Sequence, residues 1–439
     1  MNKKNWIWAT VCFAIILTIH LVHLIIHRTS LIGKESFYYI NDALQEAGNN
    51  WYSWFLMSST GQLQVETTSF IVLILSGMLS FILFMLLLEK LEENEKIKQL
   101  SMFFLLASPL FIYNISVSQP FAILSVLFIA TIYFLMFEDF LKYLSIPTSA
   151  LVAFLDPGVF IFFILPLLFY ILIKKKNSLL IGAVSLISLI ITSLRIETLH
   201  MKDVAFSLSH FLEENISMFG ALKGFTFISC LLVLIAFIYT WKKKKEFLPI
   251  YAMVVLALFS SFYIEDSYKI LLNFLLAYAS AYGLYKLMHI RWELLLIKKL
   301  IVIIVITGIV ISGIFYVNFL YSKSPSQDMV GALNFIRGNS LEHETVFSDN
   351  EKEEWIIYFA DRKFCCHNET EDIFRTRNNE IAVNFMEKNN VSFILVDDAT
   401  KKLMQREGGS SGLEFIMENS NNFRKMKDYE EIDVWAFRR

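Results

Sequence analysis

Residues 1–321 alternate long apolar segments with short polar loops. A helix needs about 20 mostly apolar residues to cross a bilayer, and lipid satisfies no backbone polar group, so each such segment predicts a membrane-spanning helix. The predicted spans, about eleven by this criterion, are 6–26, 69–88, 100–117, 120–137, 146–156, 158–173, 178–194, 219–240, 247–264, 270–288 and 300–320. The fifth is short and bounded by prolines, which also fits a half-helix or a re-entrant segment.

Lysine and arginine gather in every second loop, and this bias orients the chain. With the N-terminus in the cytoplasm, basic clusters such as 174–176 and 242–245 fall on the inner side. The sequence therefore predicts a multi-pass protein of the cell membrane. Three segments are expected on the outer side: the loop 27–68, the loop 195–218 and the tail 322–439.

The first outer loop is rich in aromatic residues, which favour the membrane interface. Its stretch 36–57 predicts one or two amphipathic helices that lie on the bilayer surface, with a break near the Gly-Asn-Asn sequence at 48–50. This loop is expected to belong to the transmembrane domain, residues 1–321.

The tail is polar and charged, with short β-type runs between helical ones. This alternation predicts a small extracytoplasmic α/β domain at 322–439, long enough for a core of its own. The expected strands are 345–348, 363–366, 392–396 and 433–437, and the expected helices are 328–337, 352–360, 378–389 and 413–419.

Composition agrees with the hydropathy pattern. Of the 439 residues, 56% are hydrophobic and 18% are charged, whereas soluble domains carry about 25% charge. The net charge of −2 and the absence of a basic stripe argue against a nucleic-acid partner. Four cysteines are too few for a disulfide-built scaffold. The bilayer itself is the first partner that the sequence predicts.

Candidate chemistry begins with Glu35, in the sequence GKESFYYI just outside the first span. A partly desolvated carboxylate at the membrane boundary suits proton abstraction. The plainer interpretation is a solvated glutamate beside a helix N-terminus, and position alone favours it. Other candidates in or next to this loop are His27, Arg28, Lys34, Tyr38, Tyr39 and Asp42.

Lys269 follows Glu265 and Asp266 at the outer start of the tenth span. A lysine at this depth can bind a phosphate as a point charge. It can equally be a snorkelling lysine paired with one of the two neighbouring acids.

Three histidines, His20, His23 and His27, lie on one face of the first predicted helix. They could ligate a metal or line a polar cavity. We favour histidines that are hydrogen-bonded to neighbouring helices, because no acid or cysteine at ligand spacing completes a metal site. The sequence thus predicts no metal ligands.

Several segments together resemble the GT-C superfamily of polyprenyl-phosphate-dependent glycosyltransferases, which includes the oligosaccharyltransferase catalytic subunit and the protein O-mannosyltransferases. GKESFYYI (33–40) looks like the start of that family's first outer loop, with Glu35 in the acidic position. LASPLFI (106–112) is similar to its proline-containing third span. Segment 267–283 resembles the family's basic residue before an apolar helix, with Lys269 in the basic position, and NNVSFILVD (389–397) resembles an outer-domain strand.

The resemblance implies that a sugar passes from a polyprenyl (dolichyl-type) phosphate to a glycan, lipid or protein acceptor on the outer face. Glu35 would be the general base, and Lys269 would bind the donor phosphate. Oligosaccharyltransferases carry a second acidic motif where this chain has NISVSQP (114–120), and the Trp-Trp-Asp-Tyr-Gly motif of the tail does not occur. No cofactor follows from these motifs. A divalent metal stays open without support from a second acidic motif, and a metal-independent transfer of a single sugar fits better.

Two other functions stay open at this level. A transporter or flippase of a lipid-linked or polar substrate needs ionisable residues inside the spans, and the histidines of the first span are nearly the only ones. A non-catalytic GT-C-like assembly protein would use the tail for binding and would not need Glu35 or Lys269.

Overall fold

The computed structural model describes residues 3–45, 50–59, 65–156, 186–187, 190–191, 216–217, 225–241, 267–290, 295–365, 370–404 and 412–438. The chain divides into two compact units. The helical unit comprises Met1–Leu21 and Thr67–Tyr321, and the tail unit comprises Val22–Glu66 and Ser322–Arg439. The first outer loop thus groups with the tail.

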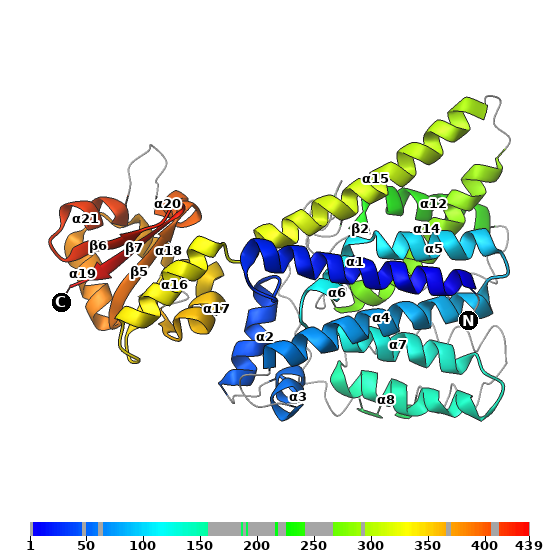
Figure 1. The fold of residues 1–439 in the computed structure, drawn as a ribbon, viewed down its shortest axis with the longest axis horizontal. Helices are drawn as coiled ribbons and strands as arrows, with labels where there is room; N and C mark the ends of the chain where they lie inside the picture. Colours follow the sequence, from blue (N-terminus) through cyan, green and yellow to red (C-terminus); the bar gives the residue numbers. More distant parts are fainter. Residues whose placement is uncertain are drawn as a thin grey trace. The chain divides into compact units, whose positions relative to one another are not determined.

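Apolar composition sets the longest helices of the helical unit (Figure 1). In the described part of the chain, three helices are long and apolar enough to cross a membrane: those that begin at α1 (Lys3–His27), α4 (Val65–Leu91) and α15 (Leu295–Ser322). All three coincide with predicted spans. The predicted spans 158–173, 178–194 and 247–264 lie wholly or mostly outside the described residues.

The third predicted span is broken into two helices. α5 (Glu95–Leu106) and α6 (Pro109–Ser116) meet at a bend of 58°. Proline supplies no backbone N–H and is suited to the first position of a helix, so Pro109 starts α6 rather than continuing α5.

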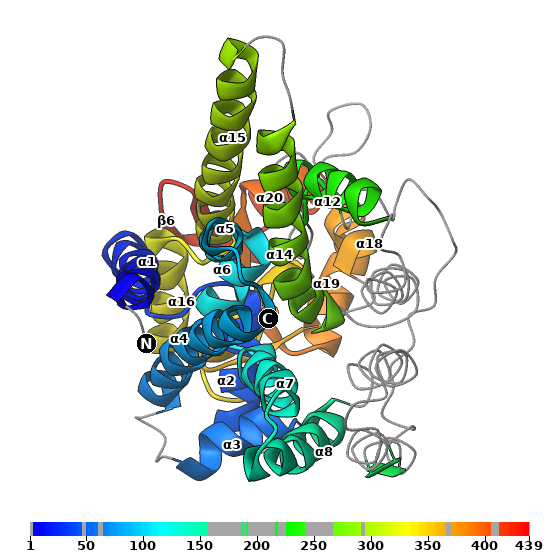
Figure 2. The same cartoon turned by 90° about the vertical axis from the view of Figure 1, so that its right-hand side faces the viewer.

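Shorter helices complete the helical unit. α7 (Phe121–Leu135) lies beside α8 (Ser145–Leu155), which follows the short helix η2 (Phe140–Leu144) (Figure 2). The predicted span 219–240 begins later than expected: a small strand pair, β1 (Ile216–Ser217) and β2 (Phe225–Thr226), precedes α12 (Phe227–Thr240).

α12 packs against α14 (Ser267–His289) at very short range. A Cβ added to Gly283 would lie 2.0 Å from the carbonyl oxygen of Leu232. Small residues allow this close approach of two helix backbones inside a membrane. Gly283 therefore fixes where these two helices cross.

The tail unit contains a five-stranded sheet of order β4-β3-β5-β7-β6. β3 (Thr345–Phe347) pairs in parallel with both β4 (Lys363–Phe364) and β5 (Val391–Asp397). β7 (Ile432–Phe437) pairs antiparallel with β5 and with the edge strand β6 (Phe423–Asp428). Sequence reasoning missed β6, because its exposed charged residues mask the period-two pattern.

Helices cover both faces of this sheet. Phe393 and Leu395 of β5 pack on the side of α16 (Gln327–Asn339), and Ile394 and Val396 pack on the other side, as strand alternation requires. The short helices η5 (Asn350–Lys352), α17 (Glu353–Trp355) and η6 (Ile356–Ala360) follow β3. The second face carries α18 (Thr370–Arg375), α19 (Asn379–Lys388), α20 (Asp398–Met404) and α21 (Leu413–Asn419). α18 and α20 were not predicted.

The first outer loop forms α2 (Lys34–Leu44) and α3 (Trp51–Ser59), so the two predicted helices exist. The apolar side of α2 does not depend on a bilayer for its burial. Phe37 is fully buried, with its ring centroid 5.1 Å from that of Tyr358 and 5.4 Å from that of Phe359 in the tail. α2 is therefore part of the core of the tail unit.

Candidate active site

The start of α2 positions Glu35. Gly33 precedes the helix with φ 78° and ψ 155°, a conformation that glycine adopts without steric cost. Its N–H donates to Ser324 Oγ at 3.1 Å, which ties the start of the helix to the tail. Glu35 then lies half-buried in the first turn, where the helix dipole favours a negative charge.

Three further contacts hold α2 in place. Lys34 Nζ donates to the Asn350 carbonyl at 2.8 Å. Asn41 Nδ2 donates to both the carbonyl and the carboxylate of Glu354, each at 2.9 Å. A carboxylate on a helix anchored in this way keeps a defined position, as a catalytic base requires.

The other first-loop candidates differ in exposure. Asp42 is 9% exposed, and its Oδ2 has no hydrogen-bond partner within the described ranges. Tyr38 is exposed, and its ring meets Tyr39 edge to face at 5.1 Å between ring centroids. Tyr39 also contacts Tyr52 of α3 at 5.5 Å. The aromatic residues thus link α2 to α3, and Asp42 is a second carboxylate in this loop.

The histidines of α1 bond to backbone carbonyls. His20 Nε2 lies 3.0 Å from the Ile115 carbonyl oxygen, and His23 Nδ1 lies 3.0 Å from that of Thr29. His27 Nδ1 lies 3.0 Å from the Pro325 carbonyl oxygen and its ring stacks on His23. His20 thus bonds to a neighbouring helix, as expected, whereas His23 bonds to a carbonyl just after its own helix and His27 to one just before α16. Arg28, at φ 57°, is exposed just after the helix.

Lys269 is the third residue of α14 and is only 2% exposed. Glu265 and Asp266, its expected partners, lie outside the described residues. Glu35 and Lys269 belong to different units, and each is described within its own.

Two hydrogen bonds show in which direction α14 runs relative to α5 and α6, the two halves of the broken third span. Ser108, just before α6, donates to Asn273 Oδ1 at 2.7 Å, and Tyr278 donates to Glu92, just before α5, at 2.8 Å. The helices are therefore antiparallel. Lys269 lies one helical turn, about 6 Å, beyond Asn273. This direction places it alongside α6.

The last turn of α6 and the start of its connection to α7, residues 114–119, form a polar feature that sequence reasoning passed over because it has no acid. We name it the polar turn. Asn114, Ser116 and Gln119 are at most 2% exposed. Asn114 Oδ1, Ser116 Oγ and Gln119 Nε2 have no hydrogen-bond partner among the residues that the structure describes. Each such atom costs about 1–3 kcal/mol.

Three neighbouring helices hold the polar turn. Asn114 Nδ2 donates to Ser125 Oγ of α7 at 3.1 Å, and the Ile115 carbonyl meets His20 of α1. Ser118 is hydrogen-bonded to Ser69 of α4. The turn, which continues from α6, is thus fixed by its surroundings while three of its polar atoms have no partner.

The tail unit has a buried ionic cluster at the carboxyl ends of β3 and β5. Lys352 pairs with Asp349 and, at 2.9 Å, with Asp397. Thr400 Oγ1 lies 2.8 Å from Asp397 Oδ1 and 3.1 Å from Asp349 Oδ2. Burial alone would raise the pKa of Asp397, but the Lys352 charge and hydrogen bonds from Lys352 and Thr400 lower it.

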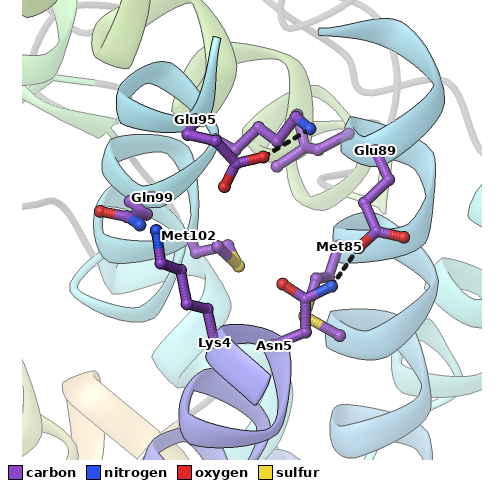
Figure 3. A pocket seen from close by; sticks show the side chains of 9 residues that line it. Lys4, Asn5, Met85, Glu89, Glu95, Gln99 and Met102 are labelled. Carbon is purple, nitrogen blue, oxygen red and sulfur yellow. Dashed lines mark hydrogen bonds and ion pairs between the residues drawn. The ribbon is translucent and has the colours of Figure 1, made fainter. Parts of the chain in front are cut away.

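Described residues of the helical unit line a small polar cavity and a larger apolar groove. The polar cavity of about 20 Å³ lies between the start of α1, the end of α4 and α5, where Asn5 bonds Glu89 and Lys98 pairs with Glu95 (Figure 3). It has room for about one water. The groove of about 770 Å³ runs along α1, α5, α6 and α15, and nearly all of its lining is apolar. Its size and lining suit a hydrocarbon chain.

Among the described residues, no group of three or more His, Cys, Asp and Glu side chains is arranged to hold a metal ion. The polar turn offers two amides and hydroxyls, which are neutral donors and acceptors. Carboxylate ligands, which Mg²⁺ and Ca²⁺ prefer, are missing from residues 114–119.

No protein-family model matches the chain, and neither does any of the curated proteins compared with it. Solved structures do. The Archaeoglobus fulgidus oligosaccharyltransferase in complex with Zn and sulfate is 12% identical with a TM-score of 0.62, over 89% of this chain and 68% of that one.

Two further structures contain a lipid phosphate. The same organism's AglB, with an inhibitory peptide and a dolichol-phosphate, is 10% identical with a TM-score of 0.60, over 90% of this chain and 69% of that one. ArnT from Cupriavidus metallidurans, bound to undecaprenyl phosphate, is 11% identical with a TM-score of 0.53, over 99% of this chain and 98% of that one.

These likenesses confirm the resemblance that the sequence motifs predicted: the chain has the fold of the GT-C glycosyltransferases. It is a mostly helical membrane-type fold with a small additional sheet. The number of spans, near eleven by the length rule, and the orientation of the termini remain predictions.

Proposed function

We propose that this protein is a membrane glycosyltransferase that moves a sugar from a polyprenyl (dolichyl-type) phosphate to an acceptor on the outer face of the membrane. The observation that carries the proposal is the GT-C fold, which covers 99% of this chain in the likeness to ArnT. The buried Lys269 and the apolar groove along α1 add support, because a lipid phosphate needs a cation and a hydrocarbon surface.

The reaction needs a base and a stabiliser of the leaving group. Glu35 accepts the proton of an acceptor hydroxyl, and the acceptor oxygen then attacks the anomeric carbon of the sugar. The bond between that carbon and the phosphate oxygen breaks. The polyprenyl phosphate leaves with the electron pair, and Lys269 stabilises its charge. No metal takes part in this scheme.

The remaining parts have supporting roles. The groove along α1 holds the polyprenyl chain, and residues of the first outer loop shape the acceptor side. The segment 195–218 lies outside the described residues except for 216–217. The tail binds the acceptor, which is a glycan, a lipid or a protein. In this proposal the N-terminus is cytoplasmic and the tail is extracytoplasmic, as the distribution of basic loops favours.

The first test measures how much of the donor lipid remains in the membrane. Membrane lipids from a null strain, complemented with wild-type protein or Glu35→Gln at equal membrane levels, are analysed by mass spectrometry. A transferase consumes its donor, so one sugar-charged polyprenyl phosphate should accumulate in the null and Glu35→Gln strains and fall with the wild type. Glu387→Gln, at an exposed glutamate of α19, is the matched control and should behave as the wild type.

The same measurement separates the alternatives. A flippase would change the distribution of the charged lipid between the leaflets and not its total amount. An assembly protein would need the tail and tolerate Glu35→Gln. Full donor consumption by Glu35→Gln would remove Glu35 from the reaction.

A further inference from the structure

We propose that the polar turn, residues 114–119, is a metal-free subsite that binds hydroxyl groups of the donor's sugar. This inference rests on the proposed function and deepens it, because it assigns the recognition of the sugar to residues that no acidic motif marks. Recognition uses neutral hydrogen bonds from the side chains of Asn114, Ser116 and Gln119.

The chemistry of the three unpartnered atoms matches a polyol. Asn114 Oδ1 accepts a hydrogen bond, Gln119 Nε2 donates one, and Ser116 Oγ does either. A sugar hydroxyl likewise both donates and accepts. A phosphate or carboxylate would offer acceptors only and would leave Asn114 Oδ1 unpaired.

The burial of these atoms makes a solvated surface loop an unsuitable explanation. Non-helical backbone at membrane depth is tolerated where protein buries it or where it lines a polar cavity. All ten residues from 111 to 120 are buried. Residues 117–120, which join α6 to α7, therefore hold polar side chains inside the protein.

The surroundings keep the turn rigid without using the three atoms. Asn114 Nδ2 donates a hydrogen bond to Ser125 Oγ, and Ser118 bonds to Ser69. The Ile115 carbonyl is contacted by His20. Side chains locked by such contacts hold their remaining polar atoms in fixed directions, which selective recognition requires.

The turn and Lys269 belong to the same unit and both flank α6. α14 runs antiparallel to the broken third span. Lys269 therefore lies beyond Asn273, in the direction of the C-terminal end of α6, where the polar turn begins. α6 has eight residues and is about 12 Å long. This order suits a donor whose phosphate is held by Lys269 and whose sugar reaches the turn.

The test measures which lipids the full chain selects. Wild-type protein in detergent is incubated with equal amounts of undecaprenyl phosphate and of sugar-charged polyprenyl phosphates extracted from the host, and the bound lipids are counted by native mass spectrometry. We expect the charged lipid to be enriched about tenfold. Gln119→Met and Asn114→Leu should remove the enrichment and leave binding of the bare lipid unchanged.

Two controls make the result decisive. Ser101→Ala removes a buried hydroxyl of α5 that bonds only within its own helix, and it should keep the enrichment. Lys269→Gln should weaken both lipids together. Where a leucine or methionine variant does not fold, Ser116→Ala serves in its place.

Each outcome has one meaning. Equal binding of charged and bare lipid by the wild type, or enrichment that survives Gln119→Met, would overturn the sugar subsite and leave the proposed function standing. Variants that lose stability with unchanged selection would show that the turn holds structural water. A wild-type chain that binds neither lipid would contradict the proposed function itself.

Discussion

Two polar clusters inside the protein differ in how far their polar atoms have partners. In the tail unit, Lys352, Asp349, Asp397 and Thr400 are charged or hydroxylic, and their polar groups bond to one another. In the helical unit, the polar turn is neutral, and three of its atoms have no hydrogen-bond partner in the described part of the chain. The cluster with the larger charge is thus the one that is internally complete.

This difference in hydrogen-bond partners distinguishes a cluster that stabilises the fold from one that can bind a ligand. Paired charges rigidify the ends of two strands and use their donors and acceptors mainly on one another. An incomplete neutral cluster destabilises the chain by about 1–3 kcal/mol for each atom. Such a cost is characteristic of sites where a ligand supplies the missing partners. Substitutions in the two clusters should therefore have opposite consequences.

The largest effect is expected for Lys352→Met. It leaves the buried Asp349 and the partly buried Asp397 without a cation, and removing one partner of a buried ion pair costs about 3–5 kcal/mol. Hydrogen exchange in the full chain should speed up across β5. Lys388→Met, at an exposed lysine of α19, is the control. Unchanged exchange in β5 would mean that the ionic cluster does not stabilise the sheet.

A smaller loss is expected for Asn41→Leu. This side chain gives two hydrogen bonds to Glu354, and bonds to charged groups are worth about 1.5–3 kcal/mol. Exchange should increase in α2 and α17, with little change in β6. If α2 stays as protected as in the wild type, its aromatic contacts alone would hold it.

Acid should weaken the ionic cluster of the tail unit and leave the polar turn, which has no titratable side chain, unchanged. The pKa of Asp397 is lowered from 3.8, so its contribution to stability is complete above pH 3.8 and is lost as pH falls through the lower folded-state value. Pepsin cleavage within 391–397 should rise below that pH. Asp397→Asn should lack this step, and a wild-type profile that begins to change near pH 6 would point to another group.

The smallest effect on stability is expected for Gln119→Met. Replacing an unsatisfied amide by an apolar side chain of similar size is neutral or slightly stabilising. Thermal unfolding of the full chain should shift little, while donor selection is lost. A large destabilisation would mean that the Gln119 side chain is fully hydrogen-bonded in the folded protein. The polar turn would then stabilise the fold and would not recognise a sugar.

The sequence predicts those parts of the fold whose pattern is strong. Apolar length located α1, α4, α14 and α15, and short β-type runs located β5 and β7. β6 escaped because an edge strand with Arg424, Lys425 and Lys427 on its surface does not alternate. The break between α5 and α6 could be anticipated from Pro109.

The candidate site was only partly predictable. Glu35 and Lys269 carry charge and lie at the ends of predicted spans, so sequence reasoning finds them. Asn114, Ser116 and Gln119 resemble any polar turn until their burial and missing partners are known. The docking of α2 on the tail is equally invisible, because Phe37 and Tyr358 are far apart in the sequence.

The most direct test of the central claim is mass spectrometry of surface glycans and glycolipids in host cells that carry wild-type protein, Glu35→Gln or a deletion, with the two proteins at equal membrane levels. The account predicts that one defined sugar mass disappears in the deletion and in Glu35→Gln and is present with the wild type. An unchanged glycan profile in both altered strains would contradict glycosyl transfer by this protein.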